Sequence, residues 1–432
     1  MNAPIEAAQL APQAMAPRLA PAIVAQADTL AALRRDLHAH PELGFEENRT
    51  AAVVAQCLKD WGIQLHRMAR TGIVGVVHGR DGGACGRAVG LRADLDALPV
   101  HEHNTFAHAS TQAGRMHACG HDGHTAMLLA AAQELARTRD FDGTVYLVFQ
   151  PAEEGRGGAQ EMMAEGLFTR FPMEAVFGMH NWPGLPAGSL AASPGPVMAS
   201  ASTFKIVIRG KGAHAALPHL GTDPVVVAAQ TVLSLQTIVS RNVKPIDAAV
   251  LSVTMLHAGE ATNVIPDSCT IEGTVRTFSI AALDIIEPRF VQIAEHTAAA
   301  FGASAEVDFL RRAPPVVNTP FEAQFAAQVM RGIVGDAMVL PQEPSMPSED
   351  FAFMLQVKEG AYVFIGNGEG AHRHSGHGMG PCMLHNPSYD FNDSLIPLGA
   401  TYWLRLAEQW LAAPPPPPRT LGSRVFCALT EP

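Results

Sequence analysis

The chain has 432 residues, 47% of them hydrophobic, and its 30 basic and 41 acidic side chains give a formal net charge of −11. A chain of this length exceeds the size at which a single hydrophobic core stops growing, so two domains are expected. The acidic balance argues against nucleic acid or an anionic membrane as a partner, because phosphate binding requires a basic face. The chain contains no stretch of eighteen apolar residues, so no membrane span is predicted.

The two ends of the chain have compositions that are unfavourable for folding. Residues 1–25 are rich in Ala and Pro and lack a basic cluster followed by an apolar core, so we expect a disordered extension and not a signal peptide. The proline run at 414–418 predicts an extended segment, and residues 413–432 are expected to form a Pro-rich tail. The six cysteines show no paired spacing, which favours a reducing compartment and a cytoplasmic protein.

Between these ends, strand-like and helix-like patterns alternate, which predicts an α/β fold with a central, mostly parallel sheet flanked by helices. The expected helices, the first of them capped by Asp28, are 29–38, 46–61, 123–136, 321–334 and 395–412. The expected strands are 72–78, 88–91, 144–150, 175–180 and 361–365. Ligands of open α/β sheets gather at the carboxyl ends of the strands, so polar residues that follow these strands are candidate site residues.

The middle of the chain has a different order of elements. Its pattern is strand, helix, strand, strand, helix and strand, at 203–209, 224–240, 248–257, 269–278, 285–301 and 305–310. This order suits a small α+β layer. We therefore expect an inserted domain at 199–312, which divides the catalytic domain into 26–198 and 313–412.

Two short segments indicate a metal site with its own general base. Cys119 and His121 are two residues apart in a Gly-containing turn, where a thiolate and an imidazole can face one divalent cation. Glu153 and Glu154 directly follow an apolar run. Neighbours in an extended segment point to opposite sides, so one carboxylate can bind metal while the other faces a bound water. Histidines that end other apolar stretches complete a donor set sufficient for two metals: His180 and His385.

Seven short motifs follow one another along the chain: RDLHAHPE at 35–42, LRADLDALP at 91–99, CGHDGH at 119–124, QPAEEG at 150–155, GKGAH at 210–214, NVIP at 263–266 and HNP at 385–387. In these motifs and their order the chain resembles the di-metal amidohydrolases that include hippurate hydrolase, aminoacylase and the indole-3-acetyl-amino acid hydrolases. The resemblance extends from about residue 28 to about residue 410.

The resemblance implies a ligand set and a catalytic group. The implied ligands of two divalent metal ions are Cys119, His121, Glu154, His180 and His385. Glu153 is the implied acid/base, which takes a proton from the attacking water and returns it to the leaving amine. The identity of the metal stays open among zinc, manganese, cobalt and nickel.

One position departs from more distant members of the family, which place a ligating histidine where this chain has Arg92. An arginine cannot bind a cation, so the site resembles the cysteine-containing variant, with Cys119 expected to bridge the metals. Asp94 is then expected to orient a ligand from outside the coordination sphere.

Residues that contact the substrate are expected in the inserted domain. His214 is the best candidate for a donor to the developing oxyanion, from its own chain or across a dimer interface. Arg276 and Asn263 are expected to hold the substrate's α-carboxylate, since guanidinium pairs bidentately with carboxylate. The resemblance implies that the domain is both a lid and a dimerisation surface, so a homodimer or a higher homo-oligomer is expected.

The leading hypothesis is an amidohydrolase that cleaves N-acyl-L-amino acids, such as hippurate-like conjugates, to a carboxylic acid and a free amino acid. One alternative is a metallo-carboxypeptidase or dipeptidase that uses the same site on a peptide bond. Another is a catalytically degenerate binding protein, and the intact Glu153 and ligand set argue against it. The sequence does not rank the possible acyl groups.

Overall fold

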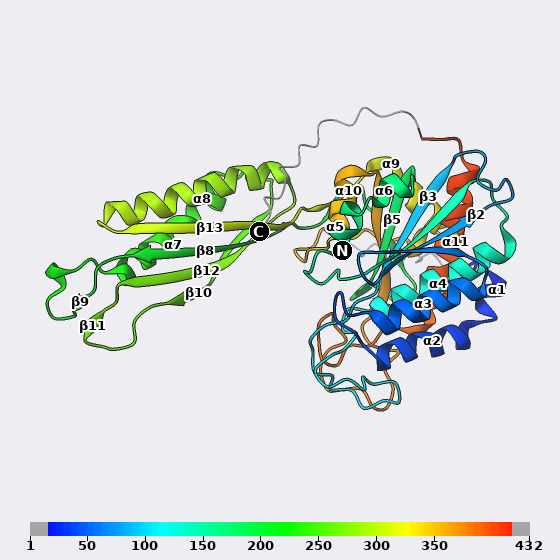
Figure 1. Cartoon of the computed structure of the whole chain (residues 1–432), viewed down its shortest axis with the longest axis horizontal. Helices are drawn as coiled ribbons and strands as arrows, with labels where there is room; N and C mark the ends of the chain where they lie inside the picture. Colours follow the sequence, from blue (N-terminus) through cyan, green and yellow to red (C-terminus); the bar gives the residue numbers. More distant parts are fainter. Residues whose placement is uncertain (1–15, 417–432) are drawn as a thin grey trace, which may run out of the picture. The chain divides into compact units, whose positions relative to one another are not determined.

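The computed structural model describes residues 16–416, which form two compact units (Figure 1). Unit 1 consists of the described residues up to 193, residues 319–342 and the described residues from 358 onward. Unit 2 consists of residues 194–318 and 343–357. No helix in the described part of the chain has the length and apolar character that crossing a membrane requires.

Unit 1 is built on a seven-stranded sheet with the order β1-β2-β4-β3-β5-β15-β6. Its four central strands are parallel: β4 (Thr144–Gln150), β3 (Ala88–Asp94), β5 (Ala175–Pro183) and β15 (Gly360–Gly368). Its outer strands pair antiparallel: β1 (Gln64–Met68), β2 (Gly72–His78) and β6 (Leu190–Ala191). Every residue of β3 and β15 is buried, as expected for strands covered on both faces. The predicted α/β class is confirmed.

Helices cover this sheet and supply most of the apolar core. The longer ones are α2 (Ala27–Ala39), α3 (Asn48–Asp60), α4 (His121–Thr138), α9 (Pro320–Val334) and α11 (Ile396–Ala412). Short helices and 3₁₀ turns connect them: α1 (Pro21–Val24), α5 (Gly158–Ala164), α6 (Leu167–Arg170), η2 (Asp336–Met338) and η3 (Asp393–Leu395). α4 packs against α11, α2 and β3, so the helix that begins with His121 is fixed from several sides.

Two expectations for this unit need correction. Residues 16–25 are ordered, because Ala20 and Ile23 are buried in the core and the Arg18 amide donates to the Ile333 carbonyl. Residues 1–15 and the tail from 417 lie outside the described residues. Asp28 does not cap α2, which begins at Ala27 after the N-cap Gln26. The carboxylate of Asp28 lies instead in the first turn, where it interacts favourably with the positive end of the helix dipole.

Strand β3 continues three residues past its expected end at 91, through two charged side chains. It can do so because Arg92 Nη1 lies 2.7 Å from Asp94 Oδ2, which forms a buried ion pair within the strand. This extension carries Asp94 to the carboxyl edge of the sheet, where β4 and β5 also end.

Unit 2 contains a four-stranded antiparallel sheet with the order β10-β12-β8-β13. These strands are β10 (Ala249–His257), β12 (Ser268–Thr277), β8 (Ala201–Arg209) and β13 (Ser304–Ala313). α7 (Pro224–Arg241) packs on β12 and β10, and α8 (Ile280–Ala300) packs on β13 (Figure 1). Burial alternates along β8 and β13, as expected for a sheet covered on one face.

The remaining elements of unit 2 are small. The strand pair β9 (Ala213–His214) and β11 (Val264–Ile265) lies beyond one end of the sheet, followed by the 3₁₀ turn η1 (Pro218–Leu220) (Figure 1). β7 (Gly195–Met198) pairs with β14 (Val316–Asn318), and α10 (Phe351–Val357) packs on β14. α8 begins five residues before its expected start at 285, because Ser279 caps it by accepting a hydrogen bond from the Ala282 amide.

Candidate metal centre

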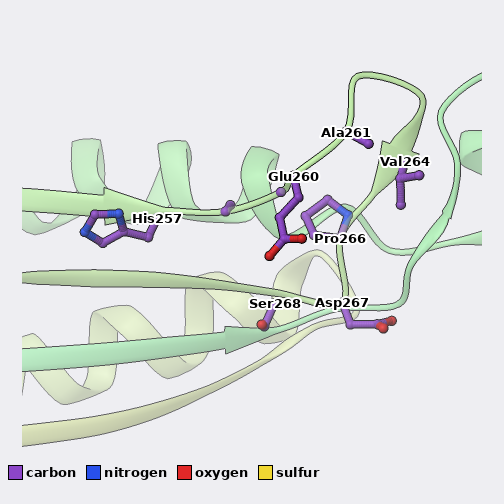
Figure 2. A pocket seen from close by; sticks show the side chains of 9 residues that line it. His257, Glu260, Ala261, Val264, Pro266, Asp267 and Ser268 are labelled. Carbon is purple, nitrogen blue, oxygen red and sulfur yellow. The ribbon is translucent and has the colours of Figure 1, made fainter.

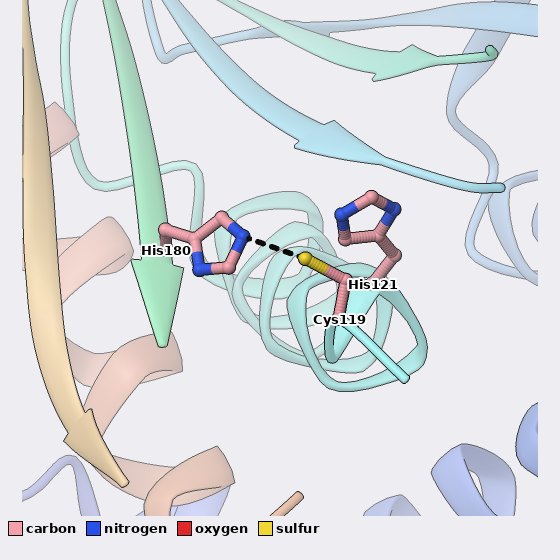
Figure 3. Close-up of side chains that lie close together, drawn as sticks. All are labelled: Cys119, His121 and His180. Atoms are coloured by element: carbon pink, nitrogen blue, oxygen red, sulfur yellow. Dashed lines mark hydrogen bonds between the residues drawn. The ribbon is translucent and has the colours of Figure 1, made fainter. Parts of the chain in front are cut away.

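The turn before α4 brings a thiol and an imidazole to the carboxyl edge of the sheet. Sγ of Cys119 lies 3.3 Å from Nε2 of His180, which β5 carries (Figure 3). Gly120 makes the turn possible with φ 94°, a left-handed conformation. A Cβ at this position would meet Asn181 Oδ1 at 2.1 Å and the Tyr389 hydroxyl at 2.6 Å, so a larger residue would displace these side chains.

The ring of His121 is oriented so that its Nε2 can bind a cation. Its Nδ1 donates to the carbonyl oxygen of Asp96 at 2.8 Å. Although burial lowers the pKa of this ring, Asp94 and Cys119 raise it well above the usual value, so a bound cation would take the place of the proton on Nε2. That Nε2 is buried and has no hydrogen-bond partner among the described residues. The ligand atoms of Cys119, His121 and His180 all lie within 4.8 Å of one another. A buried, unpaired imidazole nitrogen beside a thiol and a second imidazole fits a divalent cation.

His180 is held in the neutral form that binds metals. Burial lowers its pKa well below the usual value, and the nearby ring of His124 acts in the same direction. Its Nδ1 lies 2.6 Å from the Asn181 carbonyl oxygen, to which it donates. Nε2 is therefore the free acceptor, directed at the sulfur of Cys119 (Figure 3).

A second donor group shares the same sulfur. The ligand atoms of Cys119, Glu154 and His385 also lie within 4.8 Å of one another. Nε2 of His385 is 3.3 Å from Oε1 of Glu154. His385 has a positive φ of 63°, unusual for a residue other than glycine, and its amide donates to the Ala118 carbonyl at 2.7 Å. Because Cys119 belongs to both groups, its sulfur is placed where it can bridge two ions.

The electrostatics of the second group also favour a cation. Burial raises the pKa of the Cys119 thiol, and the Glu154 carboxylate raises it further. Hydrogen bonds to Cys119 and Glu154 raise the pKa of His385 to about 10. The shift of His385 reflects its acidic neighbours, and a divalent ion bound here would be their countercharge once it displaced the protons of the thiol and the imidazolium.

Glu153 lies beside the two donor groups that contain Cys119 but belongs to neither of them. It is buried, with 8% of its surface exposed, and its carboxylate lies within 4.8 Å of the ligand atoms of His121 and Glu154. The two glutamates follow β4 at the carboxyl edge of the sheet. Glu154 is fixed by its own amide, which donates to Asp96 Oδ2 at 3.0 Å.

Asp94 makes its shortest contact with His124 and lies farther from the candidate ligand His121. Its Oδ1 accepts from His124 Nδ1 at 2.6 Å, while its Oδ2 is 3.8 Å from His121 Nε2. Although burial alone would raise its pKa, His121, His124 and Arg92 together hold that pKa well below the usual range. Nε2 of His124 accepts from the Asn181 amide at 3.0 Å, so the histidine links β3 to β5.

Sequence reasoning assigned no role to Asp96, which contacts both donor groups. Its carbonyl orients His121, and its carboxylate holds the Glu154 amide. A signal was present in the sequence, since Asp94 and Asp96 are two residues apart and extended chain places such residues on one side.

The three candidate substrate residues all lie in unit 2, but not together. His214 and Asn263 are exposed neighbours at the β9–β11 pair, whereas Arg276 is near the end of β12. Nδ1 of His214 accepts from the Ala216 amide at 3.0 Å, so its Nε2 carries the proton and is a donor. From Arg276 to the start of β12 at Ser268 the chain extends roughly 26 Å, and the β9–β11 pair lies beyond that point.

Arg276 is a cation without a counterion. It is half-buried, its Nη1 is buried without a hydrogen-bond partner, and it forms no ion pair with another residue of the described chain. Burial lowers its pKa. Since Val275 is buried under the helices, Arg276 is on the uncovered face of the sheet.

A pocket of about 600 Å³ lies at the opposite end of this sheet, close in sequence to Asn263 (Figure 2). Its walls include His257, Glu260, Val264 and Asp267. It contains none of the candidate metal ligands.

Comparison with known proteins identifies the chain's relatives. Residues 90–409 match the model of peptidase family M20/M25/M40. The chain is 40% identical over 383 residues to N-acetyl-L-cysteine deacetylase of Bacillus subtilis, covering 87% of this chain and 86% of that protein. It is 38% identical over 381 residues to hippurate hydrolase of Campylobacter jejuni, covering 88% and 96%. A dinuclear metal-binding peptidase of family M20 from Bacillus subtilis superimposes with a TM-score of 0.77 at 33% identity, covering 90% of this chain and 99% of that one.

Proposed function

The chain belongs to peptidase family M20/M25/M40, and on that basis we propose that it is a metal-dependent amidohydrolase that cleaves N-acyl-L-amino acids to a carboxylic acid and a free amino acid. The observation that carries the proposal is the pair of donor groups that share Cys119, with the Glu153 carboxylate beside them. Hippurate-like and N-acetyl conjugates are the substrate classes that the names of the relatives favour.

Two divalent ions fit the donors. Cys119, His121 and His180 would hold one ion, and Cys119, Glu154 and His385 would hold the other. When bound, such ions polarise an amide carbonyl and lower the pKa of water toward neutrality. The mixture of sulfur, nitrogen and oxygen donors is compatible with zinc, cobalt, manganese or nickel, and zinc or cobalt suits the thiolate best.

Glu153 is the proposed acid and base of the reaction. Its carboxylate removes a proton from the attacking water and delivers that proton to the nitrogen of the breaking amide bond, which makes the amine a competent leaving group. Burial beside the donor groups keeps Glu153 close to the reacting atoms. Glu154 differs in its role because its carboxylate contacts His385 and serves as a ligand.

Substrate binding is assigned to unit 2, with two copies of the chain contributing. Arg276 would pair with the α-carboxylate, Asn263 would assist in holding the substrate, and His214 would donate its Nε2 proton to the developing oxyanion. Roughly 26 Å or more separates Arg276 from His214 along one sheet, so a single copy cannot bring both to one small substrate. A homodimer would solve this problem, because each site can take Arg276 from one copy and His214 from the other.

The connectivity favours His214 as the residue from the neighbouring chain. Ala201 pairs with Ala313 at the end of the sheet that carries Arg276, so the two chain segments that enter and leave this sheet do so at that end. The His214 end is the free end of unit 2. We therefore propose a homodimer, or a higher homo-oligomer built from it, in which unit 2 is both the lid and the dimerisation surface.

A second candidate function is the hydrolysis of short peptides by a carboxypeptidase or dipeptidase. The similarity to a dinuclear metal-binding peptidase favours keeping it. A panel of N-acetyl, benzoyl and indole-acetyl amino acids, tested beside dipeptides with metal content measured on the same preparation, separates the two. Turnover of dipeptides but not of acyl amino acids would contradict the first proposal.

A cytoplasmic location is also proposed, because a reducing compartment preserves the Cys119 thiol.

A further inference from the structure

A buried arginine of unit 1 contacts the chain segments that follow two of the candidate ligands, His121 and His385. Arg34, on α2, is fully buried. Its Nη1 lies 2.9 Å from Asp390 Oδ1 and 3.4 Å from Asp122 Oδ2, and its Nε lies 2.6 Å from Asp393 Oδ1. One guanidinium therefore joins three carboxylates.

The three carboxylates belong to chain segments that carry candidate metal ligands. Asp122 directly follows the ligand His121 in the first turn of α4. Asp390 and Asp393 lie in the loop that begins with the ligand His385 and leads into α11. The clamp, as we call Arg34 with Asp122, Asp390 and Asp393, thus ties two ligand-bearing segments to a helix that itself carries no ligand.

A second contact from α2 supports the same arrangement. Nδ1 of His38 is 2.9 Å from Asp122 Oδ2, and its Nε2 is 3.3 Å from Glu102 Oε1. Asp122 is therefore held from two sides, by Arg34 and by His38. Asp390 also contacts His377 at 3.2 Å, so several polar groups fix the direction of this carboxylate.

The two donor groups differ in how much they depend on such a clamp. His121 and His180 are each oriented by a short hydrogen bond to a backbone carbonyl, at 2.8 Å and 2.6 Å. The side chain of His385 is 55% exposed, and its ring contacts fellow ligands, Glu154 and Cys119. Apart from the hydrogen bond of its amide to the Ala118 carbonyl, the position of His385 depends on the loop around it, which the clamp anchors.

We propose that Arg34 is a positioning residue that holds the His385 loop in register with the start of α4 and thereby sets the affinity of the Cys119–Glu154–His385 group for its ion. This inference rests on the proposed function, which supplies the ions. Arginine suits the task because its planar fork directs several donors at once, whereas a lysine would offer one compact charge that reaches fewer of these carboxylates. Loss of the guanidinium would remove the one cation that the three carboxylates share, so the attraction that holds the two segments together would be weakened.

The test is a metal titration of chelator-treated protein with zinc or manganese, followed by calorimetry below the unfolding temperature. Wild-type protein should take up two ions per chain. Arg34→Lys and Arg34→Met should bind the ion of the Cys119–His121–His180 group as wild type does. They should bind the ion of the Cys119–Glu154–His385 group about 10- to 100-fold more weakly, the range typical of groups that orient metal ligands. The matched control is Arg35→Met, since Arg35 is exposed and pairs only with the outer Asp393 in this cluster; both of its ions should bind as in wild type.

The ratio of the two affinities separates a positioning role from a structural one. A general loss of stability would weaken both ions together or neither, so an unchanged ratio in folded Arg34 variants would overturn the clamp. Where Arg34→Met does not fold, Asp390→Asn carries the test by the same criterion, because it removes one of the two carboxylates that link Arg34 to the His385 loop and leaves Arg34 paired with Asp122 and Asp393. Wild-type protein that binds no ion would instead overturn the proposed function.

Discussion

The sulfur of Cys119 lies 3.3 Å from Nε2 of His180, although the two residues are 61 positions apart in the chain. This contact joins the turn before α4 to the end of β5, and it places the same sulfur beside Glu154 and His385 as well. The donor groups are thus one connected cluster, and the first predictions concern its members.

Removal of metal should abolish hydrolysis, and Cys119→Ala should lower the content of both ions, because the sulfur belongs to both donor groups. Metal content by plasma spectrometry and turnover after exhaustive chelation are the measurements. Circular dichroism should show that the fold of the variant is retained. Full activity in protein that contains no metal would refute the site.

Glu153→Gln should reduce turnover by about a hundred- to ten-thousand-fold, since the amide cannot accept the proton of water. Its metal content and substrate affinity should stay near those of wild type. Glu154→Gln is the matched comparison, because it should lose metal first. If the Glu153 variant lost metal and the Glu154 variant kept it, the two roles would have to be exchanged.

Arg276→Met should raise KM strongly for an acyl amino acid with a free α-carboxylate and change it little for the corresponding carboxamide. The loss corresponds to about 2 to 5 kcal/mol, the cost of breaking a desolvated charge pair. Lys205→Met, which removes an exposed cation from the same sheet, is the control. Equal losses on both substrates would show that Arg276 is structural.

His214→Ala and Glu153→Gln proteins, each inactive alone, should regain roughly a quarter of wild-type activity when mixed and allowed to exchange subunits. Half of randomly assorted dimers are mixed, and each mixed dimer has one site with both residues intact if His214 acts across the interface. Steady-state turnover after refolding the mixture measures this. Absence of recovery in mixtures shown to contain mixed dimers would place His214 in its own chain's site.

His38 should make stability depend on pH. Although burial lowers its pKa, hydrogen bonds to Asp122 and Glu102 outweigh burial and the nearby charge of Arg34, and raise the pKa to about 9. Because this pKa lies above the ordinary value of about 6.5, the stabilisation is complete below pH 6.5 and is lost as the pH rises through about 9.

Denaturant unfolding of wild type and His38→Asn, both with chelator present, tests this dependence. The difference in unfolding free energy between the two proteins should be larger at pH 6 than at pH 9.5. A difference that is constant over this range would mean that His38 is not charged in the folded protein.

The sequence predicted the α/β class because it depends on local patterns. The full ligand set was implied by the resemblance to the di-metal amidohydrolases, and local patterns explain why its members can meet. Apolar runs define β4 and β5, and the polar residues that follow them must lie at one edge of a parallel sheet. The role of Asp96 escaped notice because its most important contact uses a backbone carbonyl, and side-chain chemistry gives no indication of which carbonyl orients a ring.

Their common domain did not predict how far apart the candidate substrate-binding residues lie. His214, Asn263 and Arg276 share unit 2, which suggests a common site, but position along a strand decides distance. Arg276 and the β9–β11 pair are at opposite ends of the sheet, so membership of one domain did not imply proximity. Arg34 was similarly hidden, since its three partners are 88, 356 and 359 positions away.

Strand β12 sets the distance between Arg276 and the opposite end of the unit 2 sheet. Each residue inserted into it would lengthen the sheet by about 3.3 Å and would also turn every later side chain to the opposite face. Arg276 would then point under the helices and not toward the uncovered face. A one-residue insertion would therefore have to be absorbed by a β-bulge, such as the register shift between Val253 and Met255 of β10, or matched by a change in β8, to which β12 pairs from Ser268 to Val275.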